Sequence, residues 1–465
     1  MKRVDLAVLG GGSAGFAAAI RASDLGTSVA LIEGSTIGGT CVNIGCVPSK
    51  TLIRAADTYH RAGHSAYPGV KPRGADLDYA AVIRQKDELV TNLRRGKYED
   101  VLLEYPGITL LRGHATLTGP QTLRVDGETV HADKIIVATG SRPWVPDLPG
   151  LHDAGYWTST EALAATELPE SLIVIGGRYI AIELAQTFAR FGTRVTLLQR
   201  SSHLLPDGEP EIGLALQKLL EAEGIEIHTN VQLQRVTRED KATSVHAIVN
   251  DEPRSFSASQ LLMATGRHPH TRGFGLEDVG VTLGTRGALV VNESLQSSVP
   301  SIYAAGDVTG HAQYVYVAAY EGALAAENAL QGQARELDLK AVPGVTFSDP
   351  AVATVGLTEA QAIRAGHAVR TSVLPMGSVP RSLANFDTRG LIKLVADASS
   401  TEILGAHILA PDAGEMIQPA VFAVKYGLTI QDFTDTLFPY LTHVEGLRLA
   451  ARAFSTDPKK LSCCA

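Results

Sequence analysis

The chain has 465 residues, of which 45 % are hydrophobic, and this is enough apolar surface for two to four folded domains. Its 41 basic and 49 acidic residues give a formal net charge of -8 without a long run of one sign, which argues against a nucleic-acid-binding protein. No apolar run reaches the length of a membrane span, and the glycines at 10–12 interrupt the apolar N-terminal stretch before it reaches signal-peptide length. We therefore expect a cytoplasmic protein, in which four cysteines are more typical of chemistry than of structural disulfides.

The N-terminal segment predicts a dinucleotide-binding unit. An apolar strand over residues 4–9 leads into glycines with G-x-G-x-x-G spacing, then a helix-like segment and a second strand that ends in an acid. Gly10 permits the tight turn, Gly12 lets the backbone approach a pyrophosphate, and Gly15 lets the helix pack on the strand. Glu33 is placed to accept a hydrogen bond from a ribose hydroxyl.

The next segment, residues 38–50, carries the most specific signal in the sequence, since Cys41 and Cys46 stand in C-x4-C spacing. A zinc site would need further cysteines or histidines nearby, and none is present. We interpret the pair as redox-active thiols, with inert buried cysteines as the alternative. In this motif the chain resembles the FAD-dependent disulfide oxidoreductases, which include glutathione reductase, dihydrolipoamide dehydrogenase and mercuric ion reductase. The resemblance extends over essentially all 465 residues.

The resemblance implies that hydride passes from NADPH to FAD, and that electrons then reach the adjacent disulfide or a species bound by the dithiol. It implies that Cys46 lies against the flavin and that Cys41 is the outer thiol that meets the substrate. Lys50 and Glu183 match the family's buried ion pair beside the flavin, where a positive Lys50 stabilises the anionic reduced ring. Tyr98 matches a second active-site tyrosine, and the polar face of an amphipathic helix is its alternative interpretation.

A second dinucleotide unit begins with the apolar strand at 171–175. Gly176 opens its turn, but Arg178 occupies the second glycine position, where its side chain either binds the pyrophosphate or obstructs it. After the strand at 194–198, the neutral Gln199 and then Arg200 stand where an acid would bind an unphosphorylated ribose. This pair favours the 2′-phosphate of NADPH over NADH, unless Arg200 is only a solvated surface charge.

Three further apolar strands each end in a small-residue turn, at 135–140, 261–267 and 302–307. Each alone is an ordinary strand-to-turn connection of an α/β fold. Their order implies that the NADPH unit is inserted into a larger flavin unit, in which Asp307 faces the ribityl chain or phosphate of FAD. The predicted cofactor contacts are Gly10, Gly12, Ser13, Ala14, Gly15, Glu33, Gly39, Thr40, Lys50, Thr139, Gly140 and Asp307 for FAD, with Gly176, Arg178, Arg200 and Gly266 completing the set.

We therefore expect an α/β protein with two Rossmann-like domains and a C-terminal α+β domain. The predicted FAD domain covers 1–145 and 266–341, the NADPH domain 146–265, and the interface domain 342–465. By resemblance, the interface domain pairs two chains into a homodimer, so that each active site is shared between subunits. The dinucleotide unit starts within a few residues of Met1, so we expect a catalytic core without the N-terminal metal-binding domain of many mercuric reductases.

The substrate is indicated by the segment 438–445. Disulfide-reducing relatives carry His-Pro-Thr-x-x-Glu there, with the histidine as general acid, whereas this chain has Tyr440 in its place. Tyrosine is a poor proton donor at neutral pH but can orient or contact a metal. Thr442 and Glu445 keep capping-box spacing and predict a helix start. His443 is open to two interpretations, an acid near the thiols or a plain cap-region histidine.

The tyrosine and the paired cysteines at 463 and 464 fit the mercuric ion reductase branch of the family. Hg(II) is soft and prefers two thiolates, so we expect it to be held by Cys41 and Cys46 after delivery from Hg(II)–thiol complexes by Cys463 and Cys464 of the partner chain. A disordered end or a strained vicinal disulfide is the alternative for the tail. For the whole protein, the alternatives to NADPH-dependent Hg(II) detoxification are a disulfide reductase and a mercury-binding flavoprotein without turnover.

Overall fold

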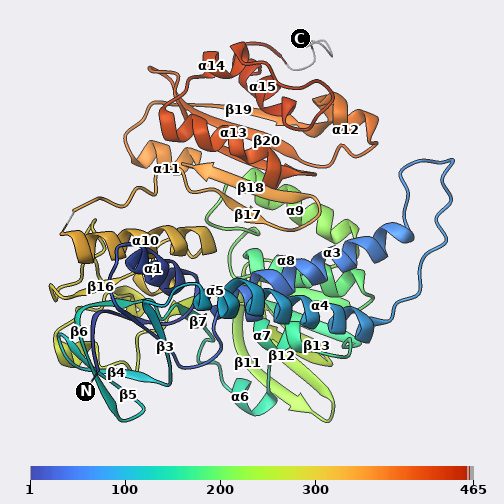
Figure 1. Ribbon diagram of the computed structural model, residues 1–465. Coiled ribbons are helices and arrows are strands. Elements are labelled where there is room, and N and C mark those ends of the chain that lie inside the picture. Colours follow the sequence, from blue (N-terminus) through green and yellow to red (C-terminus); the bar gives the residue numbers. More distant parts are fainter. Residues whose placement is uncertain (1, 333, 458–459, 461–465) are drawn as a thin grey trace. The chain divides into compact units, whose positions relative to one another are not determined.

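The computed structural model describes residues 2–332, 334–457 and 460, which divide into two compact units (Figure 1). The first unit comprises residues 1–51, 81–144 and 266–338, and the second comprises 52–80, 145–265 and 339–465. The division into FAD, NADPH and interface domains, with the boundaries given above, stays a prediction.

The first unit is built on a seven-stranded sheet in the order β3-β2-β1-β6-β5-β4, with β16 pairing to β6. The pairs among β1, β2, β3, β6 and β16 are parallel, whereas β4 and β5 continue the sheet as antiparallel strands. All five residues of β2 are buried, as expected for a strand covered on both faces. The strands are β1 (Lys2–Leu9), β2 (Val29–Glu33), β3 (Ile108–Arg112), β4 (Ala115–Gly119), β5 (Thr122–Val125), β6 (Glu128–Val137) and β16 (Ile302–Ala304).

Helices α1 (Ser13–Asp24) and α10 (Val315–Gln331) lie side by side on one face of this sheet (Figure 1). Their close approach needs a glycine, because a Cβ at Gly322 would lie 2.0 Å from the carbonyl oxygen of Ala14. The other helical elements near the N-terminus are α2 (Gly39–Ile44), α3 (Cys46–Ala62), α4 (Tyr79–Arg94), the π-helical η1 (Arg95–Glu99) and α5 (Asp100–Leu103).

The second unit contains a parallel sheet in the order β10-β9-β8-β14 and an antiparallel sheet in the order β11-β12-β13. Apolar side chains of both sheets share one core. The parallel strands are β8 (Ser171–Ile175), β9 (Arg194–Leu198), β10 (Glu226–His228) and β14 (Gln260–Met263), and the antiparallel ones are β11 (Val231–Glu239), β12 (Ala242–Val249) and β13 (Glu252–Ala258). The helices are α6 (Leu151–Ala154), α7 (Ser159–Ala164), α8 (Tyr179–Arg190) and α9 (Pro210–Ala222).

The C-terminal part of the second unit is a five-stranded antiparallel sheet in the order β17-β18-β21-β20-β19, whose apolar side chains pack with those of its helices. Its strands are β17 (Gly344–Thr346), β18 (Ala351–Gly356), β19 (Val369–Pro375), β20 (Leu391–Asp397) and β21 (Ile403–Ala410). Its helices are α11 (Glu359–Arg364), α12 (Pro380–Ala384), α13 (Ala413–Tyr426), α14 (Ile430–Asp435) and α15 (Glu445–Arg452).

The predicted fold class is confirmed: two Rossmann-like units, one inserted into the other, precede an α+β C-terminal part. In the sequence, the insertion is flanked by two short strands of the first unit, β7 (Ser141–Pro143) and β15 (Arg267–Pro269), which pair as an antiparallel sheet. Strand β16 then returns to pair with β6. Within the described ranges, none of the helices combines the length and apolar composition needed to cross a bilayer.

Candidate active site

The first dinucleotide turn has the geometry that its glycines predict. Gly10 has φ +107°, and a Cβ there would lie 2.3 Å from the carbonyl oxygen of Ala138, so only glycine fits. A Cβ at Gly15 would lie 1.8 Å from the carbonyl oxygen of Gly10. Gly12 is the N-cap of α1 and provides no side-chain cap, which leaves the first N–H groups of the helix available to an anion. The residues present therefore fit a dinucleotide pyrophosphate.

Glu33 lies at the end of β2 with its carboxylate beside this turn. Its Oε2 accepts a hydrogen bond from the Gly11 amide at 2.8 Å, and its Oε1 accepts from the Ser35 amide at 2.7 Å. Oε1 also accepts from the Ser35 hydroxyl at 3.0 Å, so Oε2 is the oxygen that retains capacity for a ribose hydroxyl. The contacts also hold the side chain in one orientation.

The cysteine-bearing loop is fastened to the same turn. Gly38 and Gly39 both have positive φ, and a Cβ at Gly39 would lie 2.7 Å from the Cα of Gly12. The Asn43 amide donates to the carbonyl oxygens of Ile37 and Gly39 at 2.9 and 3.0 Å. Arg94 of α4 donates in turn to Asn43 at 3.2 Å. Sequence reasoning missed these two bracing residues, although Asn43 lies between the two cysteines.

Cys41, half-buried on α2, and Cys46, exposed at the start of α3, are not joined in a disulfide. The hydrogen bond of Cys41 to Cys46, together with burial, raises the pKa of the Cys41 thiol, and the positive charge of Lys50 opposes this rise. The Cys41 thiol therefore keeps its proton at neutral pH and is hydrogen-bonded to Cys46. Which of the two sulfurs lies against the flavin stays a prediction.

Tyr98 belongs to the π-helical element η1, a type of helix that often occurs at functional sites. Its ring packs against Phe16 of α1 with centroids 4.7 Å apart, and its side chain hydrogen-bonds Ser13. Burial raises the Tyr98 pKa, and the neighbouring Cys41 and Cys46 raise it further. The structure therefore places a neutral phenol beside the two predicted redox thiols.

Asp307 and the turn at 139–141 meet at the carboxyl ends of β6 and β16. The Ser141 hydroxyl donates to Oδ2 of Asp307 at 2.6 Å and accepts from Nε of Arg267 at 2.8 Å. Thr139 donates to the carbonyl oxygen of His270 at 2.6 Å. Asp307, Thr139, Gly140 and Gly266 were predicted, but Ser141 and Arg267 were missed, although each directly follows a predicted glycine.

Glu321 is a further missed residue, on the buried face of α10. It is fully buried, and its Oε2 accepts from the Gly306 amide at 2.7 Å while His311 lies 2.9 Å from Oε1. Glu321 thus fixes the peptide directly before Asp307. An isolated glutamate in an apolar helix pattern gives no warning of this role.

The second dinucleotide turn repeats the first with changed chemistry. Gly176 has φ +130°, and a Cβ there would lie 2.3 Å from the carbonyl oxygen of Ala264. Gln199 lies over Gly177 as Glu33 lies over Gly11, but it carries no charge. Arg200 follows it and is exposed, and the described residues include no ion-pair partner for it. The turn therefore fits a dinucleotide whose ribose end is anionic.

Comparison with known proteins supports this assignment of two nucleotide sites. Residues 4–322 match the family described as pyridine nucleotide-disulphide oxidoreductase, and residues 342–451 match the dimerisation domain of that family. The chain belongs to the pyridine nucleotide-disulphide oxidoreductase family. Use of a flavin and of NAD(P)H follows from this membership.

Several relatives are similar over nearly the whole chain. Mercuric reductase from Staphylococcus aureus is 47 % identical over 99 % of this chain and 84 % of its own length, and mercuric reductase from Streptomyces lividans is 47 % identical over 99 % of this chain and 98 % of its own length. A solved structure, the Cu(II) complex of the HOCl-induced flavoprotein disulfide reductase RclA from Escherichia coli, has a TM-score of 0.87 at 32 % identity, over 97 % of this chain and 99 % of its own.

In this pyridine nucleotide-disulphide oxidoreductase, Glu183 is buried on α8 and its Oε1 accepts from the Phe347 amide at 2.9 Å. Lys50 is half-buried on α3. The two residues belong to different compact units, so their pairing stays a prediction.

The dimerisation domain presents Tyr440 on the loop between α14 and α15, with 53 % of the residue exposed. The predicted capping box is wrong: α15 begins at Glu445 with Val444 as N-cap, and the Thr442 hydroxyl donates instead to the carbonyl oxygen of Pro439 at 2.7 Å. The loop thus turns on itself before the helix starts, which is why Thr442 is not at the cap. Cys463 and Cys464 lie outside the described residues.

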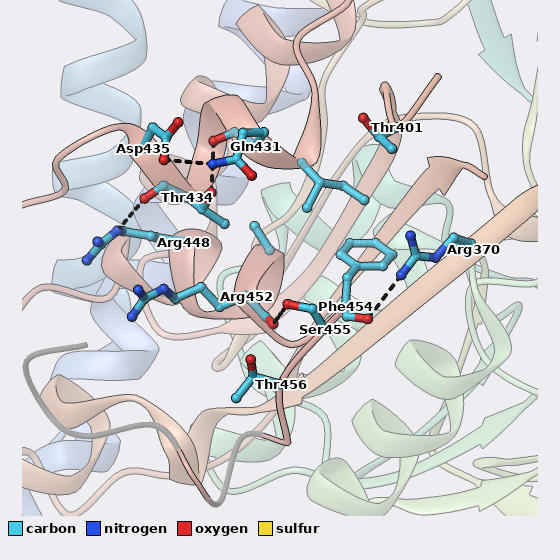
Figure 2. Close-up of a pocket in the computed structure, with 12 residues that line it drawn as sticks. Arg370, Thr401, Gln431, Thr434, Asp435, Arg448, Arg452, Phe454, Ser455 and Thr456 are labelled. Carbon is cyan, nitrogen blue, oxygen red and sulfur yellow. Dashed lines mark hydrogen bonds between the residues drawn. The ribbon is translucent and has the colours of Figure 1, made fainter. Parts of the chain in front are cut away.

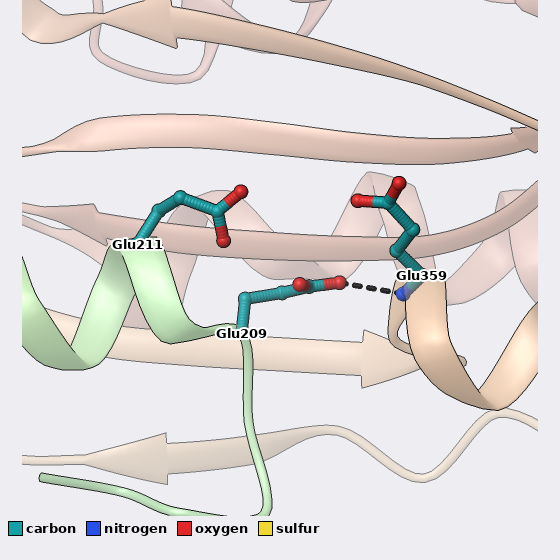
Figure 3. A group of neighbouring side chains, drawn as sticks. All are labelled: Glu209, Glu211 and Glu359. Atoms are coloured by element: carbon teal, nitrogen blue, oxygen red, sulfur yellow. Dashed lines mark hydrogen bonds between the residues drawn. The ribbon is translucent and has the colours of Figure 1, made fainter. Parts of the chain in front are cut away.

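Two polar features of the second unit lie outside the predicted site. Figure 3 shows the carboxylates of Glu209, Glu211 and Glu359 pointing toward one another. The buried Lys393 ammonium lies 2.8 to 2.9 Å from all three, so it fills the position that a metal ion would take.

The other feature is a groove of about 920 Å³ in the dimerisation domain (Figure 2). Two of its three arginines are engaged by backbone: Arg448 donates to the Thr434 carbonyl at 3.0 Å and Arg370 to the Phe454 carbonyl at 3.1 Å. These contacts tie the last helices to β19.

Proposed function

We propose that this protein reduces Hg(II) to elemental mercury with electrons from NADPH by way of bound FAD. The observation that carries the proposal is the pair of adjacent thiols, Cys41 and Cys46, beside the phenol of Tyr98, in a chain that has tyrosine rather than histidine at position 440. Seven relatives named mercuric reductase share 44 to 47 % identity over at least 99 % of the chain, which supports the same activity.

The two thiols suit the substrate. Hg(II) prefers two thiolate ligands, and its reduction by two electrons breaks two Hg–S bonds and returns both thiolates. NADPH supplies the two electrons and becomes NADP⁺ and a proton, so no disulfide is cleaved and no thiolate leaving group needs a general acid. A flavin, when bound, carries the electron pair between the nicotinamide and the dithiol side. In this scheme Cys46 is the thiol next to the flavin and Cys41 the outer ligand.

The remaining site residues have supporting roles in the proposal. The FAD pyrophosphate binds over Gly10, Gly12 and the first turn of α1, where Ser13, Ala14 and Gly15 lie, and Glu33 binds the adenosine ribose. Gly39, Thr40, Thr139, Gly140 and Asp307 line the remainder of the flavin site. Lys50, held by Glu183, stabilises negative charge on the reduced ring.

The coenzyme is NADPH rather than NADH in this proposal, because Gln199 cannot repel a 2′-phosphate and the guanidinium of Arg200 can bind it. Gly266, where a Cβ would have no neighbour within 4 Å, leaves space for the dinucleotide, and Gly176 permits the tight turn against Ala264. In the first unit, Glu33 occupies the position that Gln199 has in the second, and its negative charge suits an unphosphorylated ribose.

The active enzyme is proposed to be a homodimer in which Tyr440 of the partner subunit reaches the Cys41 and Cys46 thiols. The dimerisation domain exposes large apolar side chains on α13, namely Phe422 and Tyr426, and on the loop after α14, namely Leu437, as a contact surface would. Cys463 and Cys464 are proposed to capture Hg(II) from external thiols and pass it to the inner pair by thiolate exchange.

The test is NADPH oxidation by the FAD-loaded dimer in excess small thiol, with and without Hg(II), while released mercury vapour is trapped and quantified. We expect oxidation that depends on Hg(II), with one Hg(0) released per NADPH. Oxidised glutathione and oxidised lipoamide are assayed in parallel. Faster turnover with either disulfide would replace the proposal by a disulfide reductase, and Hg(II) binding without NADPH oxidation would replace it by a sequestering flavoprotein.

A further inference from the structure

The turn of the second dinucleotide unit carries an arginine that is already engaged. Arg178 is the N-cap of α8, with an extended backbone and no side-chain cap on the helix. Its guanidinium makes a bidentate contact with Asp207, Nη1 to Oδ2 at 2.5 Å and Nη2 to Oδ1 at 3.0 Å. Both side chains are more than half exposed, at 51 % and 66 %. The charge at the turn is therefore paired without being buried.

Asp207 belongs to the segment that follows β9, the same segment that begins with Gln199 and Arg200. The Leu205 amide donates to the Gly177 carbonyl at 2.8 Å, which fastens this segment to the turn. The Arg178–Asp207 pair thus bridges two loops at the carboxyl ends of β8 and β9. In sheets of this type those ends are where a dinucleotide binds.

We infer that Asp207 holds Arg178 as an exchangeable counter-charge for the pyrophosphate of the coenzyme, so that coenzyme binding requires Arg178 to leave Asp207. The inference rests on the proposed use of NADPH by this unit. It goes further by assigning a role to Arg178 and by naming a residue, Asp207, that weakens coenzyme binding.

Charge and geometry support the exchange. A pyrophosphate carries two negative charges at the N-terminus of α8, next to the Cα of Arg178, and a guanidinium binds phosphate oxygens with the same fork that it uses for a carboxylate. An exposed ion pair contributes little to stability, so Arg178 can leave Asp207 at small cost. Asp207 is also a like charge to the pyrophosphate, which adds to its unfavourable effect on binding.

The experiment measures dissociation constants of NADP⁺ and NAD⁺ by calorimetry on the oxidised, FAD-loaded protein, so that no turnover occurs. Asp207→Asn should tighten both coenzymes by about 3- to 10-fold, because it releases one charge-assisted pair. Arg178→Gln should weaken both by a similar factor. In the double variant Asp207→Asn should have a much smaller effect, since only the repulsion between Asp207 and the pyrophosphate remains to be removed.

The matched control is Glu170→Gln. Glu170 pairs with Arg194 at 2.6 Å, both side chains are exposed, and Arg194 is the first residue of β9, at the opposite end of the strand from the coenzyme edge. The net charge changes as it does in Asp207→Asn, so an effect of overall charge would appear in both variants. We expect unchanged dissociation constants for Glu170→Gln.

Comparison of the two coenzymes separates pyrophosphate from 2′-phosphate. An equal effect on NADP⁺ and NAD⁺ supports the inference, and an effect of Arg178→Gln on NADP⁺ alone overturns it in favour of the 2′-phosphate. Weaker or unchanged binding in Asp207→Asn also overturns it and makes the pair a fixed clamp or a bystander. If the unaltered protein binds neither coenzyme, the proposed function itself fails. If the unaltered protein binds the coenzymes but Asp207→Asn does not tighten them, only the inference about Asp207 fails.

Discussion

The Nδ1 atom of His443 lies 3.0 Å from Oδ2 of Asp412, and the His443 residue is only 5 % exposed. The imidazole is therefore held against the start of α13 within its own domain, while Tyr440, three residues earlier, is largely exposed. Nε2 of His443 is buried and has no hydrogen-bond partner among the described residues. This placement favours a structural role over that of an acid at the thiols.

We predict that His443→Asn, whose amide can still donate to Asp412, changes kcat for Hg(II) by less than about twofold and leaves its pH profile in place, because no proton is lost from the reaction. The measurement is Hg(II)-dependent NADPH oxidation from pH 6 to 9. Loss of a titrating limb in that range would show that His443 does supply a proton. As a control, Asp412→Asn should tolerate the φ of +60° at this position and lower the free energy of unfolding by about 1 kcal/mol.

The two cysteines should differ in spectroscopic behaviour. The proposed function assigns thiolate character to Cys46, and the raised pKa of the Cys41 thiol, caused by its hydrogen bond to Cys46 and by burial, agrees with this order. Cys46→Ala should abolish the long-wavelength absorbance of a thiolate in contact with oxidised flavin, whereas Cys41→Ala should retain it. The measurement is the long-wavelength absorbance of each variant with its remaining cysteine reduced and its flavin oxidised. A band that survives in Cys46→Ala would move the assignment to Cys41.

Tyr98→Phe tests whether the Tyr98 hydroxyl contributes to Hg(II) turnover or whether the ring serves only to pack the core. The ring keeps its packing on Phe16, and only the hydroxyl beside Ser13 and the thiols is lost. We expect a fall in Hg(II) turnover of about 10-fold, the size of one lost polar contact, with unchanged NADPH oxidation by small artificial acceptors. Tyr105→Phe, in the same core but without a described contact to the cysteines, serves as the control. Unchanged Hg(II) turnover in Tyr98→Phe would make Tyr98 a packing residue.

Replacement of both Cys463 and Cys464 by alanine tests the proposed carrier role of the tail. Turnover should fall sharply when Hg(II) is held by bulky thiol ligands, because each delivery step exchanges one thiolate for another. Small ligands such as bromide should largely restore activity, since the ion then diffuses directly to Cys41 and Cys46. FAD content and the thiolate–flavin absorbance should not change. Equal turnover of the variant and the unaltered protein with bulky complexes would exclude the carrier role.

Lys393 should be a stability residue without any metal dependence. Lys393→Met leaves Glu209, Glu211 and Glu359 as neighbouring carboxylates without their cation, which should cost about 3 to 5 kcal/mol of unfolding free energy. Chelators should not change the melting temperature of the unaltered protein. Burial lowers the Lys393 pKa, but the three carboxylates outweigh it and raise the pKa above 10.5. Its contribution is therefore present at neutral pH and is lost as the pH rises further. It is also lost in acid, where Glu211, whose pKa the contact with Lys393 lowers, becomes protonated.

The sequence by itself determined the features that depend on local spacing. The glycines of both turns, the Cys41–Cys46 motif and the order of the apolar strands were sufficient for the fold class, because the tight turn at Gly10 and the close approach at Gly15 admit no Cβ. Glu33 was predictable from local spacing as well, because it is the last residue of a buried strand.

The tertiary structure alone decided which distant side chains hold the site in place. Ser141 accepts from Arg267 and donates to Asp307, although the three residues are far apart in the sequence. Glu321 likewise fixes the Gly306 peptide from another element. The pairing of Arg178 with Asp207 and of His443 with Asp412 likewise depends on loop paths that no local pattern encodes. A short motif fixes the backbone it contains, whereas hydrogen bonds across the fold depend on where packing brings separate elements together.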